Sequence, residues 1–94
     1  MPEEKIIQKV KHLDLGNSLN HIQNVAERVL SPRKWTRYVA KSHKDYVACE
    51  GMDGILLNGQ YFDWKEFVIH KDDMVKAYLR YFDESDIQLI AEAM

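Results

Sequence analysis

Apolar residues recur at helical spacing along most of the chain, and the first such line lies at the N-terminus. Ile6, Val10 and Leu13 share one side of a helix, which predicts a helix over residues 2–12. A second line predicts a helix that ends at about Leu30. Its members are Leu19, Ile22, Val25, Ala26, Val29 and Leu30.

Turn and capping residues separate the first three predicted helices. Gly16 supplies a turn after the first helix, and Asn17 or Ser18 can cap the second. Ser31 can cap a third helix, with Pro32 at its first position, where the missing N–H breaks no helical hydrogen bond. Short connections of this kind favour neighbouring helices that pack together.

The third helix is predicted over residues 32–44, and two continuations are open after it. Residues 45–49 fit either a longer helix or a strand. A strand there, turned by residues 50–53, would join the following hairpin in a three-stranded meander.

Residues 55–62 do not follow the helical spacing of the preceding segments. Here two short apolar runs flank Asn58 and Gly59. A two-residue type I′ turn requires positive φ at both central positions. Asn tolerates such a φ and Gly adopts it freely, so this pair predicts a β-hairpin. A lone hairpin is marginally stable in water, so it must pack against other elements.

The longest apolar line follows the hairpin. Asp63 and Glu66 have the spacing of a capping box, which predicts a helix start. The line predicts a helix to Phe82 with one core face, interrupted at Lys71, and a break near His70–Lys71 stays open because Asp72 can restart a helix. Its apolar members are Trp64, Phe67, Val68, Met74, Val75, Tyr78, Leu79 and Phe82.

A last helix is predicted after Ser85, which can cap it. Its apolar residues Ile87, Ile90 and Met94 either close the core or form a self-association contact in a homodimer. The elements together predict a single compact domain over residues 1–94, mainly α with a small antiparallel β-hairpin or meander (α+β), in the order ααα-ββ-αα.

Composition places the chain among ordinary globular proteins. It is 46% hydrophobic and 30% charged, and it contains no apolar run long enough for a membrane span. The N-terminus lacks the basic and apolar segments of a signal peptide, and the single cysteine, Cys49, has no partner for an intramolecular disulfide. We therefore expect a cytoplasmic protein, of a cell or of a host cell.

Charge is divided unevenly between the two halves of the chain. Residues 1–44 carry nine Lys/Arg and four Asp/Glu, a net of +5, and residues 45–94 carry four and eleven, a net of −7. This asymmetry favours a charged partner, or two halves that neutralise each other in the fold.

Most of the positive charge falls on the predicted third helix. A row at i, i+4, i+8 and i+11 places basic residues along one side, and it forms the predicted basic face. This face comprises Arg33, Lys34, Arg37, Lys41 and Lys44. Such a row can bind phosphates, with helix 33–44 in the major groove and hairpin 55–62 as a wing. The pI of about 6.0 argues against nucleic-acid binding, because domains that bind nucleic acid are typically strongly basic.

The second half offers an acidic face instead. Its candidate residues are Asp72, Asp73, Asp83, Glu84 and Asp86. A negative patch can steer a basic partner. At each single position, a carboxylate at a helix start, where it interacts favourably with the helix dipole, is the better explanation.

Catalytic and metal-binding patterns are missing from the sequence. No phosphate-binding glycine loop or nucleophile elbow occurs, and the four histidines share no metal-ligand spacing with Cys49. An EF-hand fails because, with Gly59 as the sixth loop residue, Leu56 and Lys65 occupy ligand positions. We expect no enzyme, no metal and no cofactor.

The sequence therefore predicts a small non-enzymatic binding or regulatory protein that acts through protein–protein contacts on a charge-polarised surface. The alternative is a nucleic-acid-binding regulator that uses the basic helix. A homodimer is compatible with either function.

Overall fold

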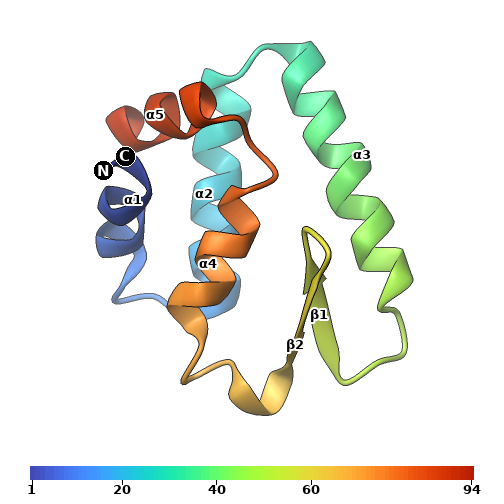
Figure 1. The fold of residues 1–94 in the computed structure, drawn as a ribbon. Coiled ribbons are helices and arrows are strands. Elements are labelled where there is room, and N and C mark those ends of the chain that lie inside the picture. Colours follow the sequence, from blue (N-terminus) through green and yellow to red (C-terminus); the bar gives the residue numbers. More distant parts are fainter.

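Five α-helices and one β-hairpin make up the fold, as described for residues 1–94 by a computed structural model (Figure 1). The bounds are α1 Pro2–Val10, α2 Leu15–Val29, α3 Pro32–Ala48, β1 Gly54–Leu57, β2 Gln60–Asp63, the 3-10 turn η1 Trp64–Glu66, α4 Lys71–Leu79 and α5 Glu84–Ala93. This confirms a mainly α fold with a small antiparallel hairpin in the order ααα-ββ-αα.

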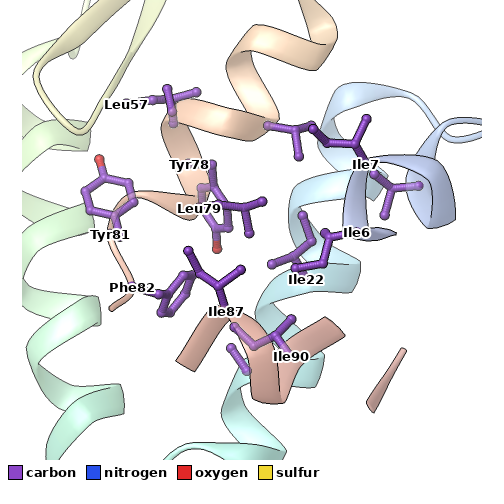
Figure 2. Packing of buried hydrophobic residues seen from close by; sticks show 14 of the residues in the cluster. Ile6, Ile7, Ile22, Leu57, Tyr78, Leu79, Tyr81, Phe82, Ile87 and Ile90 are labelled. Atoms are coloured by element: carbon purple, nitrogen blue, oxygen red, sulfur yellow. The ribbon is translucent and has the colours of Figure 1, made fainter. Parts of the chain in front are cut away.

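One hydrophobic core joins α1, α2, α4 and α5. Figure 2 shows Ile6, Ile22, Leu79 and Ile90 meeting at its centre from these four helices. The two chain ends lie side by side because α1 packs against α5 (Figure 1). By contrast, α3 runs along the side of the molecule, and Tyr38 is its one buried residue.

Helix starts follow local capping chemistry. The side chain of Asp14, rather than Asn17 or Ser18, caps α2 by accepting the Asn17 N–H at 2.8 Å, so that expectation was wrong by one turn. Ser18 is instead buried, and its hydroxyl donates at 3.2 Å to the Val10 carbonyl at the end of α1, which also accepts the Leu13 N–H at 3.0 Å. Ser31 caps α3 as predicted.

The turn at Asn58–Gly59 has the predicted conformation, with φ of 49° and 85°. It pairs Leu57 with Gln60, and the register continues to Gly54 opposite Asp63. Residues 45–48 form the end of α3, with Cys49 as its C-cap, and not a strand, so the sheet has two strands and no meander. Asp45 and Cys49 lie i+7 and i+11 from Tyr38, which keeps all three on the inner side of one helix.

The single helix predicted from Asp63 to Phe82 is wrong in its first half. Asp63 caps only the 3-10 turn, accepting the Lys65 N–H at 2.9 Å, and α4 begins at Lys71, close to the break that the sequence left open. Trp64, Phe67 and Val68 are therefore 44%, 38% and 75% exposed rather than part of a core face. The core prediction holds for the second half, where Met74, Val75, Tyr78, Leu79 and Phe82 are buried.

Candidate functional site

A cluster of aromatic rings attaches the middle of α3 to the rest of the protein. Tyr38 stacks on Phe82 with ring centroids 4.7 Å apart, and its hydroxyl shares a hydrogen bond with the hydroxyl of Tyr78. Burial raises the pKa of Tyr38 and Tyr78 above the ordinary value for tyrosine. Both phenols are therefore protonated at neutral pH, and one hydroxyl donates a hydrogen bond to the other.

Polar contacts fix α3 on either side of this cluster. Near its start, Lys34 Nζ lies 2.8 Å from Asp86 Oδ1 on α5. Near its end, the Tyr81 hydroxyl donates to Asp45 Oδ2 at 2.5 Å and accepts the Asn58 N–H at 2.8 Å. Burial and the bond to Asp45 raise the pKa of Tyr81. The hydroxyl thus joins α3, the hairpin turn and the segment after α4.

The predicted basic face is formed in part. Arg33, Arg37, Lys41 and Lys44 are all exposed along one flank of α3, and none of them forms an ion pair. Lys34 differs from these four because it is half-buried against Asp86.

The predicted acidic residues do not form one face. Asp72 and Asp73 lie in the first turn of α4, whereas Asp83, Glu84 and Asp86 lie around the first turn of α5. The rest of α4, six residue steps or about 9 Å from Asp73 to Leu79, lies between the two groups. Asp86 is buried, so it is not available to a partner.

Opposite charges from the two halves meet in a small hollow. Arg37 and Lys41 line this hollow together with Asp83 and Asp86, above the ring of Phe82. The two halves of the chain therefore compensate each other locally at this position.

The predicted self-association residues close the core instead of lying on the surface. Ile87 and Ile90 are buried and point from α5 towards the interior (Figure 2), and Met94 packs at the edge of the same cluster. Their burial agrees with the first of the two interpretations offered by the sequence, closure of the core, and self-association through this helix stays a prediction.

A long apolar groove lies on the opposite flank of α3, between α2 and α3. It consists of two hollows of about 580 and 530 Å³ that share Gly16, Leu19 and Ile55. We call it the α2–α3 groove. Its exposed or half-buried apolar residues come from four separate elements and are Leu19, Val39, Tyr46, Ile55, Trp64 and Phe67.

The α2–α3 groove is almost free of charge. Its two hollows are lined by 14 and 7 residues, three of them shared, and Asp14 is the one Asp, Glu, Lys or Arg among them. The Asp14 carboxylate is already used, because it accepts hydrogen bonds from the backbone and side-chain amides of Asn17 at 2.8 and 3.1 Å. In a chain that is 30% charged, this depletion distinguishes the groove from the remaining surface.

Comparisons with protein-family models, curated proteins and solved structures found no match. The candidate site is therefore argued from the chemistry of this chain. The groove is also lined by the polar side chains of Asn20 and Gln23 on α2, and of Ser42 and His43 on α3. These side chains can form hydrogen bonds with an occupant.

Residues that often carry chemistry are dispersed elsewhere in the structure. Cys49 is buried and donates its thiol hydrogen to the Tyr46 carbonyl at 3.4 Å, while His70 lies 3.9 Å from Glu66 and 3.6 Å from Asp73. No group of three or more His, Cys, Asp or Glu is arranged to hold a metal ion. None of the helices combines the length and the apolar character needed to cross a membrane.

Sequence reasoning missed the α2–α3 groove for a specific reason. The apolar spacing places Trp64 and Phe67 on a helical core face, and the pattern of the third helix draws attention to its basic residues alone. The useful signal was the restart at Asp72, because a helix that begins there leaves residues 64–70 outside the core periodicity.

Proposed function

We propose that this protein is a non-enzymatic binding protein that holds a segment of a protein partner in the α2–α3 groove. The observation that carries the proposal is a continuous apolar groove with exposed aromatic side chains and no free charge. Interface cores in protein complexes have this composition: aromatic residues are enriched there and charged residues are depleted.

The energetics favour occupation of the groove. Burial of apolar surface contributes roughly 25 cal/mol per Å². Aromatic anchors near the centre of an interface each contribute about 2 kcal/mol or more when they are fully desolvated. Trp64, Phe67 and Tyr46 leave part of their rings in water in the free protein, so a partner that covers them recovers this free energy.

The titratable groups of the groove support binding rather than catalysis. Tyr38, Tyr78 and Tyr81 line it, and burial raises the pKa of each one, which makes each a weaker acid than free tyrosine. Two other side chains of the groove are of types used as general bases. The Asp14 carboxylate already accepts two hydrogen bonds from Asn17, and His43 makes no ion pair with a carboxylate.

A peptide-display selection tests this function with random sequences in place of the natural partner. Linear 16-residue random peptides are selected on the immobilised wild-type protein, and the best binders are measured by fluorescence polarisation. The wild-type protein is compared with two single variants, Val39→Lys and Val47→Lys.

The two valines form a matched pair on one helix. Val39 is 41% exposed and lines the groove, whereas Val47 is 49% exposed and lies outside it. A lysine at position 39 introduces a charge into a surface without a countercharge, so binding is expected to weaken by about tenfold or more, while Val47→Lys is expected to leave affinity within about twofold. Selected peptides that bind all three proteins equally would rule out the groove as the binding site.

The basic flank of α3 supports nucleic-acid binding as a second candidate. Arg33, Arg37, Lys41 and Lys44 are exposed and without ion pairs, and a row of this kind can neutralise phosphates. The hairpin is a poor wing in this arrangement because its turn is tied to the Tyr81 hydroxyl.

A gel shift with generic duplex DNA and RNA at low and high salt tests the second candidate. The double variant Arg37→Glu, Lys41→Glu is the comparison. Binding that falls with salt and is lost in the double variant supports it. No shift at low salt excludes it, and this outcome leaves the groove proposal unchanged.

A further inference from the structure

We propose that the occupant of the α2–α3 groove is an amphipathic α-helix of a partner protein, about two to three turns long, whose buried face carries no charge. This inference rests on the proposed function and specifies the chemistry of the partner. Three features support it: the hydrogen-bonding needs of the occupant's backbone, the shape of the groove walls formed by α2 and α3, and the scarcity of charged residues in the groove.

The backbone of the occupant favours a helix over an extended segment. A strand that enters an apolar groove brings N–H and C=O groups that need partners there. β1, the strand that lines the groove, is paired with β2 along one edge and packs against α3 and α4. Because β1 is already paired and packed in this way, a segment that satisfies its own backbone hydrogen bonds, as an α-helix does, suits the groove better than a strand.

The shape argument comes from the spacing of the side chains on the two walls. On α2, Leu15, Leu19 and Gln23 are spaced at i, i+4 and i+8. On α3, the wall residues Val39 and Tyr46 are spaced at i and i+7, with Ser42 and His43 between them. Rows at these spacings are the ridges of helix surfaces, and the ridge of a third helix packs between them.

The length of the occupant follows from the α2 wall. The eight residue steps from Leu15 to Gln23 cover about 12 Å. A partner helix of about two to three turns matches this length and presents apolar anchors at i, i+3 or i+4, and i+7.

Charge complementarity defines the buried face. The groove offers amides, a hydroxyl and an imidazole, and its one carboxylate already accepts two hydrogen bonds. A lysine or glutamate at an anchor position would lose its hydration without gaining a countercharge. The groove therefore selects helices with uncharged anchors and rejects those with a charge on this face.

The test uses the best groove-dependent peptide from the display selection. The peptide is scanned with alanine, substituted with lysine at each anchor, given a central proline, and prepared with a lactam bridge between exposed i and i+4 positions. We expect anchors at helical spacing, at least about tenfold weaker binding with an anchor lysine or the proline, and tighter binding with the bridge.

Three other outcomes would overturn the inference, and they can be distinguished from one another. Anchors at every second residue, with binding weakened by the bridge and still sensitive to Val39→Lys, mean an extended occupant, and the proposed function then stands. Peptides that bind Val39→Lys and Val47→Lys equally contradict the proposed function itself. A dimer of the wild-type protein that dissociates in Val39→Lys, measured by sedimentation equilibrium, means that a second copy fills the groove.

Discussion

Lys71 connects the start of α4 to the end of α1, and its removal is expected to destabilise the protein more than any other lysine substitution on α4. The Lys71 ammonium donates hydrogen bonds to the carbonyls of Val10 at 2.8 Å and Lys11 at 3.2 Å, and also to the carbonyl of Leu13. These carbonyls end α1 and begin the turn into α2. The Lys11 and Leu13 carbonyls accept no backbone hydrogen bond, whereas the Val10 carbonyl also accepts from Leu13 and Ser18. The positive charge also interacts favourably with the C-terminal end of the helix dipole.

The magnitude follows from these contacts. A hydrogen bond to a charged group contributes about 1.5–3 kcal/mol, and the three bonds share one ammonium that is partly exposed. Lys71→Met keeps the length of the side chain and removes the donors, so we expect the free energy of unfolding to fall by about 2 kcal/mol. For a domain of 94 residues this corresponds to a fall in Tm of about 10 °C.

Urea and thermal unfolding followed by far-ultraviolet circular dichroism measure this effect. Lys76→Met is the matched control on the same helix, because Lys76 makes only a surface ion pair with Glu4 at 3.8 Å. Its expected loss is below about 1 kcal/mol. Equal losses in the two variants, or a loss below about 0.5 kcal/mol for Lys71→Met, would refute the reasoning.

The remaining predictions concern the tyrosine contacts and the hairpin. Tyr81→Phe removes the hydroxyl that joins α3 to the hairpin turn and should cost about 1–2 kcal/mol in urea unfolding. Tyr61→Phe, at an exposed ring, should cost less than about 0.5 kcal/mol, and equal costs would contradict this role. The pKa values of Tyr78 and Tyr81 are raised, so the folded state holds these protons more tightly than the unfolded state, which releases them near pH 10. Stability should therefore be complete below about pH 10 and fall as pH rises above it, and a urea midpoint that is constant from pH 9 to about 11 would contradict this. Gly54→Ala places a Cβ against the Phe62 carbonyl and the Tyr61 ring and should lower the unfolding midpoint, whereas Gly16→Ala, with its nearest contact at 3.7 Å, should not. A stable Gly54→Ala protein with an unchanged midpoint would show that this close packing is not required.

Local chemistry explains which elements could be predicted from the sequence. The hairpin was predictable because two adjacent positions must adopt positive φ, and Asn58–Gly59 is the pair best suited to do so. The start of α3 was predictable because Ser31 and Pro32 both favour a helix N-terminus. Each of these depends on two or three neighbouring residues, so no tertiary information was needed.

The errors arose where tertiary contacts decide between local alternatives. The apolar spacing of Trp64 and Phe67 fits a continuing helix. In the structure the side chain of Lys71 donates a hydrogen bond to the Val10 carbonyl at the end of α1, and α4 begins at Lys71. Residues 45–49 were ambiguous because both continuations are compatible with their composition. Asp45 lies in the last turns of α3, where it accepts a hydrogen bond from the Tyr81 hydroxyl, and Cys49 is the C-cap of the helix.

The candidate site was only partly predictable for a related reason. The basic row was found because its four residues lie on one helix, where spacing alone determines the face. The α2–α3 groove draws on α2, α3, β1 and η1, so its residues come together only through the packing of these elements. The pairing of Lys34 with Asp86, 52 positions apart, is likewise a product of the fold.

The most direct test of the α2–α3 groove as a docking site is an NMR titration of the isotopically labelled protein with the best selected peptide. The account predicts saturable amide shift changes around Leu19, Val39, Ile55 and Phe67, with intermolecular nuclear Overhauser effects from peptide anchors three or four residues apart. Shift changes concentrated on the opposite flank of α3, around Arg37 and Lys41, would contradict it.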